Sequence, residues 1–469
     1  MSTVANTIHE PGRELQIIED VDVVVAGGGP AGFPAAIAAA RRGCKVLLLE
    51  RYGFLGGLAT GGLMGPIFGY GSGKTLLLGG IPIEVLRELQ AIDGAPRNVD
   101  NWFGVRFDPE LLKHAADRMV TKAGVQLLLH AWVVAVVRKN DRIDAVVIES
   151  KSGRQAVRTK MVIDATGDGD VAVFCGCEYT KGRVADGKTQ SMGTKFRIGG
   201  VDMKNVMAHH AEERQNVNRA IDEGRIPAYH AFFGEVSEQG VTLRDTEITP
   251  TATRCPGDGT NAYDLTRAEL KARRDTLDMV EYYRQNVRGY ENCYLIDTPA
   301  VIGVRETRQI LGLETVTGAD VLANRKREDS IARGCWFIDI HCPLGRHCSK
   351  TNLCDKNCKI TPDCHMKTKH RDQLYDTLCQ SGFNTDNPGW YDVPYGSLIP
   401  RTVDNLLVSG RCISADPGGM ASVRVIATCF ALGEAAGAAA ALCLQKKRSP
   451  RELPVQALQQ DLRAAGVPL

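Results

Sequence analysis

Residues 21–51 read VDVVVAGGGPAGFPAAIAAARRGCKVLLLER, the pattern of a strand, a tight turn, a helix and a second strand. The valines at 23–25 form a β-branched apolar run, which is typical of a buried parallel strand. Gly27, Gly29 and Gly32 follow as a G-x-G-x-x-G turn. Glycine at these positions permits the turn, lets a pyrophosphate approach the backbone and lets the helix pack closely on the sheet. The stretch therefore predicts a dinucleotide-binding βαβ unit.

Two further features of this unit fit a bound dinucleotide. The helix begins directly after the turn, so its free N–H groups and its dipole favour the negative phosphates. The second strand ends in Glu50, whose carboxylate can accept hydrogen bonds from both hydroxyls of an adenosine ribose and would repel a 2′-phosphate. An unrelated glycine-rich turn would leave Glu50 unexplained.

The overall composition is that of a globular protein with more than one folding unit. The chain has 469 residues, of which 43% are hydrophobic and 24% are charged. Its net charge of +2 gives no reason to expect a nucleic acid or an acidic membrane as a partner. The first 20 residues lack the pattern of a signal peptide, and the alanine-rich segment at 432–444 is interrupted by Glu434 and predicts a buried helix. We therefore expect a cytoplasmic protein that does not enter a membrane.

The alternation of strands and helices continues to about residue 172 and is then lost, which indicates an inserted domain. The run DNLLVSG at 404–410 returns to the strand–glycine pattern, and a long helix of small residues follows from about Val423. We predict four segments: 1–172, the first part of the dinucleotide-binding domain; 173–334, an inserted α+β substrate or cap domain; 335–385, a cysteine-rich segment; and 386–469, the C-terminal part of the dinucleotide-binding domain.

Several blocks of the chain, taken in order, carry a family resemblance. They are 27–51, LGGLATGGL at 55–63, IDATGDGDVA at 163–172 and 404–441, with DLTRAE at 264–269 and IGVRETRQILG at 302–312 inside the predicted insertion. This order resembles the FAD-dependent oxidoreductases of the glutathione-reductase-like flavoproteins, and most of all the branch related to the flavin part of heterodisulfide reductase. The resemblance implies an α/β fold with a Rossmann-like FAD-binding domain of the glutathione-reductase type.

The resemblance also implies which residues surround FAD. They are Gly27, Gly29, Pro30, Ala31 and Gly32 at the pyrophosphate, Glu50 and Arg51 at the ribose, Gly56, Gly57, Leu58, Ala59 and Thr60 on the route toward the flavin, Val133 at the adenine, Ala165, Thr166 and Gly167 beside the adenosine half, Gly410 and Arg411 at the ribityl chain, and Ser422 and Val423 at the pyrimidine edge. Arg411 departs from the family pattern, which has Asp there, and this departure puts the ribityl contact in doubt. Ser422 and Val423 are expected at the start of the last helix, whose N-terminus would stabilise negative charge on the reduced flavin.

Four residues are candidates for the chemistry beside the flavin. Arg424 follows the turn that faces the flavin, and Arg305 lies in the run IGVRETRQ. Each could bind a substrate carboxylate or form a structural ion pair. Asp339 and His341 lie in FIDIHC, a strand-like run whose alternation places both on one face, where they could form an acid–base pair. A packing role for the histidine is the alternative.

The segment at 335–385 is unusually rich in cysteine. Seven of the 15 cysteines fall between Cys335 and Cys379, in a polar stretch with too few large apolar residues to form its own core. Thiolate–metal bonds would hold such a segment, and our preferred set of ligands is Cys348, Cys354, Cys358 and Cys364. An iron–sulfur cluster of the [4Fe–4S] type, a structural zinc and disulfides or thiols all remain open. The resemblance to heterodisulfide reductase favours the cluster by analogy.

These observations predict a FAD-dependent oxidoreductase that moves a hydride or electrons between a small organic substrate and flavin, with a relay through an iron–sulfur cluster. The substrate would lie between the FAD-binding domain and the inserted domain. The alternative is a flavoprotein that serves as an electron-transfer subunit, docks a partner protein and has no small substrate of its own. A homo-oligomer is left open.

Overall fold

The computed structural model describes residues 7–184, 186–227, 243–244, 246–251, 253–345 and 389–469. Its largest sheet has seven strands in the order β7-β2-β1-β10-β9-β8, with β17 also paired to β10. The strands are β1 (Ile17–Ala26), β2 (Val46–Leu49), β7 (Gln126–Leu128), β8 (Trp132–Lys139), β9 (Arg142–Ser150), β10 (Gly153–Asp164) and β17 (Leu406–Val408). Strands β7, β2, β1, β10 and β17 pair in parallel, whereas β9 pairs antiparallel with β8 and β10. The predicted α/β class is therefore confirmed.

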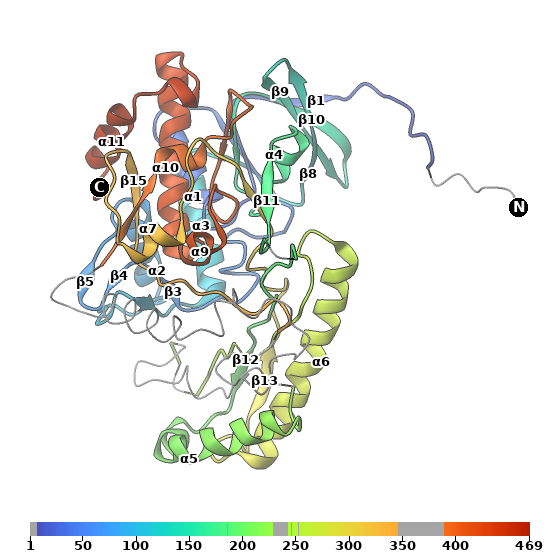
Figure 1. Cartoon of the computed structure of the whole chain (residues 1–469), viewed down its shortest axis with the longest axis vertical. Helices are drawn as coiled ribbons and strands as arrows, with labels where there is room; N and C mark the ends of the chain where they lie inside the picture. Colours follow the sequence, from blue (N-terminus) through green and yellow to red (C-terminus); the bar gives the residue numbers. More distant parts are fainter. Residues whose placement is uncertain (1–6, 185, 228–242, 245, 252, 346–388) are drawn as a thin grey trace, which may run out of the picture.

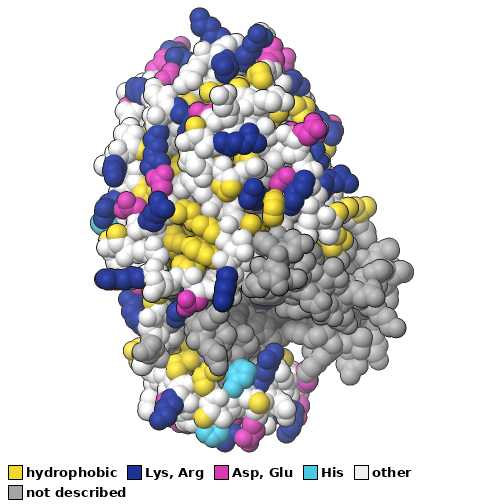
Figure 2. Space-filling model, turned by 90° about the vertical axis from the view of Figure 1, so that its left-hand side faces the viewer, with side chains coloured by type: hydrophobic (Ala, Val, Ile, Leu, Met, Phe, Trp, Pro, Cys, Tyr) yellow, Lys and Arg dark blue, Asp and Glu magenta, His cyan; other side chains and the backbone are white. Residues whose placement is uncertain are grey.

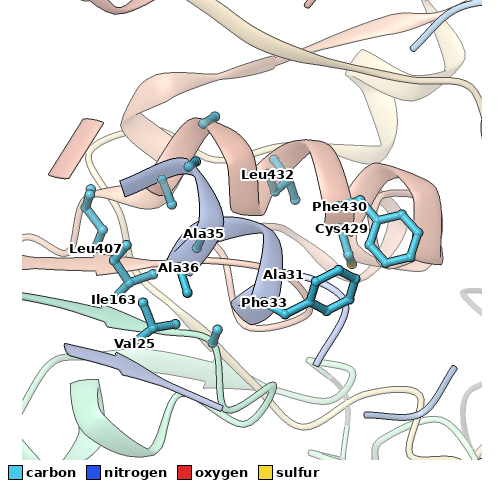
Figure 3. Close-up of a cluster of buried hydrophobic side chains, with 14 of the residues drawn as sticks. Val25, Ala31, Phe33, Ala35, Ala36, Ile163, Leu407, Cys429, Phe430 and Leu432 are labelled. Carbon is cyan, nitrogen blue, oxygen red and sulfur yellow. The ribbon is translucent and has the colours of Figure 1, made fainter. Parts of the chain in front are cut away.

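Two helices from opposite ends of the chain pack together on this sheet. They are α1 (Gly32–Ala40) and α10 (Ile426–Lys446), which lie side by side in Figure 3. The rings of Phe33 and Phe430 meet edge to face, with centroids 5.5 Å apart. A Cβ at Gly433 would lie 2.0 Å from the carbonyl oxygen of Ala31, so glycine is required for the two backbones to come this close. The first and last parts of the chain therefore share one core.

Helix α10 is the predicted buried helix of small residues. By length and composition it could cross a membrane, but 89% of its most apolar window is buried inside the protein. The helices α2 (Ile81–Ala91), α3 (Pro109–Lys122) and α11 (Val455–Ala464) surround it and α1. The side chain of Asp108 caps α3 by accepting hydrogen bonds from the backbone N–H groups of Glu110 and Leu111.

A second part of the molecule lies below the main sheet in Figure 1. It contains the helices α5 (Met203–Asp222) and α6 (Ala262–Asn286) and the antiparallel pair β12 (Arg197–Gly199) and β13 (Tyr294–Asp297). A separate hydrophobic cluster holds these elements together, with the buried rings of Phe196, Tyr283 and Tyr290 among its members. The buried residues of this second core lie between Phe196 and Cys293, whereas others of the predicted insertion, such as Ile310 and Ile331, belong to the main core. The limits of the predicted domains stay predictions.

The remaining elements are short. They are β3 (Ile67–Phe68), β4 (Gly71–Ser72), β5 (Thr75–Leu76), β6 (Gly104–Val105), α4 (Asp170–Phe174), β11 (Tyr179–Lys181), β14 (Arg308–Ile310), α7 (Gly318–Leu322), β15 (Ser330–Gly334), β16 (Tyr391–Pro394) and α9 (Pro417–Val423), with the 3₁₀ turns η3 (Tyr395–Leu398) and η4 (Pro450–Glu452). On the face shown in Figure 2, basic and acidic side chains are interspersed, in keeping with the net charge of +2.

Candidate functional site

The residues predicted to hold FAD lie at one edge of the main sheet, where the parallel strands end. Strand β1 ends at Ala26, β2 at Leu49, β10 at Asp164 and β17 at Val408, and each strand is followed by one of the predicted motifs. The carboxyl ends of parallel strands form the crevice in which α/β proteins bind dinucleotides. The fold therefore brings together motifs that are far apart in the sequence.

The glycine turn has the geometry that a pyrophosphate requires. A Cβ at Gly32 would lie 1.7 Å from the carbonyl oxygen of Gly27, so this glycine lets α1 pack against the turn. A Cβ at Gly29 would meet no heavy atom of the rest of the protein closer than the Cα of Gly57, at 3.9 Å, so the space above Gly29 is open. Helix α1 begins beside that space, and among the described residues no side chain caps its N-terminus. The turn therefore fits a bound phosphate.

Glu50 is buried directly below this turn. Its Oε2 accepts a hydrogen bond from the Gly28 N–H at 2.7 Å, and its Oε1 accepts one from the Tyr52 N–H at 2.9 Å. Burial raises the pKa of Glu50, and the backbone N–H groups oppose that shift. Each carboxylate oxygen has a second lone pair, so Glu50 can bind the turn and still accept a ribose hydroxyl. The neighbouring Arg51 lies over the ring of Tyr52, 4.8 Å from its centroid.

The other segments predicted to contact FAD adjoin the turn. In the loop 55–60, the hydroxyl of Thr60 donates to the carbonyl oxygen of Leu55 at 2.7 Å, while Gly56 and Gly57 have positive φ. In the segment 165–167, Ala165 donates its N–H to Ala26 at 2.8 Å. The predicted positions not yet placed in this description also lie in described parts of the chain: Leu58 and Ala59 in the loop, Pro30 and Ala31 in the glycine turn, Val133 in β8, and Thr166 and Gly167 after β10.

The segment after β17 returns to the glycine turn, and it carries the residue that departs from the family pattern. A Cβ at Gly410 would lie 3.0 Å from the Cβ of Ala31. The next residue, Arg411, donates to Asp168 at 2.8 Å and to the hydroxyl of Thr307 at 3.1 Å. Asp168 also accepts a hydrogen bond from Thr307 at 2.8 Å. Arg411 therefore ties the end of β17 to the segment after β10 and to the residue next to Glu306.

The expectation for Ser422 and Val423 is wrong in its local structure. They end the short helix α9, and α10 begins three residues later, at Ile426. Both side chains are fully buried, and the Ser422 hydroxyl forms a hydrogen bond with the hydroxyl of Tyr391 at 2.8 Å. Asp416 caps the N-terminus of α9, and the break between the two helices falls after it, at Val425, whose backbone is extended (φ −67°, ψ 151°). Ser422 and Val423 therefore do not begin the last helix.

Arg424, Arg305, His341 and Asp339, the predicted catalytic residues, lie close together. Asp339 Oδ2 lies 3.1 Å from His341 Nε2, and the Arg424 guanidinium donates to the Asp339 carbonyl oxygen at 2.8 Å. The segment that carries Asp339 and His341 is irregular, so the predicted strand is wrong although the predicted pair exists. Arg305 also lies outside any helix, and it donates to the carbonyl oxygen of Ser191 at 2.8 Å.

Both ring nitrogens of His341 face charged partners. Nδ1 lies 3.3 Å from a guanidinium nitrogen of Arg254. Because a guanidinium can only donate, Nδ1 accepts, and Nε2 carries the hydrogen that is donated to Asp339. Burial lowers the pKa of His341 to about 3, and Arg305 and Arg254 add to that effect. Burial alone would raise the pKa of Asp339, but His341, Arg424 and Arg305 hold it well below its usual range. The pair is thus a neutral imidazole beside a carboxylate.

Four buried residues that the sequence analysis did not single out join the predicted residues. Gln190 is central, because its Oε1 accepts the His341 N–H at 2.9 Å and its own N–H donates to Glu306 Oε2 at 2.9 Å. The others are Ser191, Arg254 and Glu306. The polar cluster, as we call it below, consists of Gln190, Ser191, Arg254, Arg305, Glu306, Asp339, His341 and Arg424. The sequence could have marked Glu306 as a candidate site residue, because charged residues interrupt the apolar run IGVRETRQILG. Gln190, Ser191 and Arg254 had no motif to mark them.

The polar cluster borders the predicted FAD site. Glu306 belongs to the cluster, and the adjacent Thr307 binds Asp168 and Arg411. Burial raises the pKa of Glu306, while the backbone N–H and the side chain of Gln190, together with Arg424 and Arg411, oppose the shift, so the two arginines act on the same carboxylate. The polar side chains of the cluster and the motifs of the FAD site thus meet at residues 306 and 307.

The predicted metal ligands Cys348, Cys354, Cys358 and Cys364 lie outside the described residues. In the part of the chain that the structure describes, no group of three or more His, Cys, Asp or Glu side chains could hold a metal ion. Cys335 is a buried thiol near the carbonyl oxygens of Gly69 and Gly71, and burial raises its pKa to about 12. An iron–sulfur cluster therefore stays a prediction.

This geometry defines the class of α/β proteins with a Rossmann-like dinucleotide-binding domain. The chain belongs to the FAD-dependent oxidoreductase family, whose model matches residues 22–462. The predicted FAD-dependent oxidoreductase is therefore confirmed at the level of the family.

Relatives in this class include curated flavin enzymes and solved structures. Over 165 residues the chain is 34% identical to thiamine thiazole synthase of Methanococcus vannielii, a match that covers 33% of this chain and 58% of that protein. Over 47 residues it is 53% identical to urocanate reductase of Eggerthella lenta, covering 10% of this chain and 8% of that protein. A geranylgeranyl bacteriochlorophyll reductase-like protein from Thermoplasma acidophilum is similar in structure, with a TM-score of 0.45 and 14% identity over 95% of this chain and 84% of that one.

Proposed function

We propose that this protein moves a hydride or electrons between FAD and a small organic substrate that binds at the polar cluster. The proposal rests on the link between the polar cluster and the predicted FAD site, which runs through residues 306 and 307. Glu306 belongs to the cluster, and the Thr307 hydroxyl donates to Asp168, which follows the end of β10 in the FAD site. A substrate at the cluster would thus lie beside the predicted flavin site.

FAD, when bound, supplies the hydride and one-electron chemistry, and the protein supplies binding, orientation and charge. In this proposal Gln190 and Arg424 orient the substrate. The side chain of Arg424 is 12% exposed, and Asp339 holds it through a hydrogen bond to the backbone carbonyl at 2.8 Å. Buried hydrogen-bond donors fixed in this way are more effective than donors in water, because they need no reorganisation when the substrate binds.

His341 is a positioning residue in this proposal. An acid–base role would require the imidazole to exchange a proton with the substrate near neutral pH. Burial lowers the pKa of His341 to about 3, and its two nitrogens face Asp339 and Arg254. The neutral ring is well suited to hold the guanidinium of Arg254 by accepting its hydrogen bond.

The test is an absorption spectrum of the anaerobically purified protein, followed by addition of candidate substrates and then dithionite. We expect flavin bands that a small organic reductant bleaches before dithionite is added. A protein that takes up no added FAD would overturn the proposal. Flavin that dithionite reduces, but that no small reductant or oxidant affects, would favour the electron-transfer subunit that docks a partner protein.

The relay through a [4Fe–4S] cluster rests on sequence alone. Cys348, Cys354, Cys358 and Cys364 occur in a segment with too few apolar residues to form a core, and flavin can split an electron pair into single electrons. The same spectrum tests this proposal: a broad brown shoulder that bleaches with dithionite supports the cluster, and flavin bands alone contradict it. The proposed cellular site is the cytoplasm, where cysteines are normally thiols or metal ligands.

A further inference from the structure

Helix α6 carries apolar side chains on its outer face as well as on its inner face. Figure 1 shows α6 along the outer edge of the molecule. Its inner face contributes buried side chains to the two smaller hydrophobic clusters of the protein. On the outer face Tyr263 is 80% exposed, Leu270 is 61% exposed and Leu277 is 59% exposed. Burial of the inner face therefore leaves a second apolar surface of the same helix in water.

The three exposed residues form one stripe along α6. They follow one another at intervals of seven residues, and seven residues fall about 20° short of two full helical turns, so all three point in nearly the same direction. The stripe from residue 263 to residue 277 is about 21 Å long, at 1.5 Å per residue. Single exposed apolar residues are common on protein surfaces, but a repeat of seven is typical of a helix that packs against another helix.

The exposed charges on this face change sign along the helix. Between residues 263 and 281 they are Arg267, Arg273 and Arg274, followed by Asp278 and Glu281. Two such helices attract each other when they lie antiparallel, because the basic half of one then faces the acidic half of the other. In a parallel pair, like charges would face each other. The outer face of α6 is therefore complementary to a second copy of itself, as a two-fold interface requires.

We infer that α6 packs antiparallel against α6 of a second copy of this chain, about a two-fold axis beside Arg274. In an antiparallel pair, residues at equal distances from the axis face each other. Leu270 of each copy therefore contacts Leu277 of the other, and Arg267 pairs with Glu281 of the other. The symmetry makes each contact occur twice. The dimer requires neither FAD nor a substrate, so its test is independent of the proposed function.

The rest of the outer face fits the same arrangement. Tyr263 comes opposite Arg284 of the second copy, whose guanidinium can lie over the tyrosine ring. The two Arg274 side chains approach each other at the axis, and Asp278 of the second copy lies one helical turn away and offsets their repulsion. Within one copy Arg284 pairs with Glu281, but exposed pairs of this kind contribute little and do not prevent pairing across the interface.

Sedimentation velocity of the purified full-length protein tests whether the dimer forms. We expect a monomer–dimer equilibrium with a Kd of about 10 μM, since one helix per copy makes a small interface. Leu270→Asp should raise this Kd about 100-fold or more, because the symmetry removes two leucine contacts at once. Val184→Asp, at a fully exposed position, is the matched control and should leave the Kd unchanged. A wild-type protein that stays monomeric at about 200 μM, or a dimer that Leu270→Asp leaves intact, would overturn the inference.

Charge reversal tests the antiparallel arrangement. Arg267→Glu places glutamates opposite each other, and Glu281→Arg does the same with arginines, so each variant should bind itself about 10-fold more weakly than the wild-type protein binds itself. An equal mixture of the two variants restores both ion pairs and should form a heterodimer with about the wild-type Kd. Mixing would not rescue a variant whose fold is damaged. A mixture that associates no more tightly than either variant alone would therefore overturn the antiparallel pairing of α6.

Discussion

The buried polar side chains of the FAD-binding part differ from those of the polar cluster in what they bind. Asp164 accepts hydrogen bonds from the N–H and the hydroxyl of Thr166 and from the N–H of Ala172, at 2.7–3.1 Å. Glu434 accepts one from the N–H of Ile81 at 2.8 Å. In the polar cluster, by contrast, the buried hydroxyl of Ser191 has no hydrogen-bond partner among the described residues. The first group fixes backbone turns, and the second group has the character of a binding site, where stability is sacrificed for function.

The largest effect should follow the loss of Asp164. In Asp164→Ala the N–H groups of Thr166 and Ala172 lose their acceptor in the core, and the turn after β10 is no longer held. We expect the free energy of unfolding to fall by about 3–5 kcal/mol, measured by urea denaturation. Asp164→Asn keeps one acceptor oxygen and should cost less. A loss below about 1 kcal/mol in the alanine variant would contradict the structural role of Asp164.

A second pair of variants separates packing from cofactor binding within the glycine turn. Gly32→Ala places a Cβ 1.7 Å from the Gly27 carbonyl oxygen and should cost about 3 kcal/mol of unfolding free energy. Gly29→Ala is its matched control, because its Cβ meets nothing in the rest of the protein closer than 3.9 Å. We expect Gly29→Ala to keep the stability of the flavin-free protein and to weaken FAD binding about 10-fold or more, measured by flavin fluorescence. Unchanged FAD affinity would contradict the open space above Gly29 as the pyrophosphate site.

The FAD-binding part could be predicted from the sequence because its signals are local. The glycine turn, the strand before it and Glu50 fall within about 30 residues. Their spacings match those of the strand, turn and acidic residue in a dinucleotide-binding βαβ unit. The C-terminal helix was predicted about three residues early, at Val423 instead of Ile426. Asp416 and Pro417 begin a separate short helix there, and the run of small residues hides the break.

The polar cluster could be predicted only in part, because its members come from distant, irregular segments. Gln190 and His341 are separated by 151 positions and meet through one hydrogen bond. Neither lies in a helix or a strand, so no periodicity indicates which way its side chain points. Asp339 and His341 were paired correctly because they are two residues apart. Arg254 has no such neighbour, and only the fold shows that it contacts His341.

The pH dependence of the unfolding free energy tests the structural role of Glu434 in the FAD-binding part. Burial raises its pKa from 4.5 to about 7. Its contribution to stability is therefore fully present below pH 4.5 and is lost as the pH rises through about 7, because the folded state holds the proton more tightly than the unfolded state. We expect Glu434→Gln, which keeps an acceptor for the Ile81 N–H, to remove roughly 2 kcal/mol of this pH dependence. Urea titrations at about pH 4 and about pH 8, roughly one half-unit or more outside the window set by the two pKa values, measure it, with the exposed Glu149→Gln as the control. Equal pH profiles for Glu434→Gln and the wild-type protein would show that Glu434 titrates normally.

The smallest effect on stability is expected in the polar cluster, and it is the most informative one. Ser191 is fully buried, and its hydroxyl has no partner among the described residues. Ser191→Ala removes a polar atom that the flavin-free, ligand-free protein does not use, so its free energy of unfolding should stay unchanged or rise by up to about 1 kcal/mol. The matched control is Thr194→Val in the adjacent buried segment, because the Thr194 hydroxyl forms a hydrogen bond with the Thr253 hydroxyl at 2.9 Å.

Thr194→Val should therefore lose about 1 kcal/mol in the same urea titration, whereas Ser191→Ala should not. If the substrate satisfies the Ser191 hydroxyl, the alanine variant should also bind that substrate more weakly. This combination, in which stability is kept and affinity falls, distinguishes a side chain that serves a ligand from one that serves the fold. Equal losses of stability in the two variants would show that the Ser191 hydroxyl has a structural partner, and the contrast between the two regions would then not extend to Ser191.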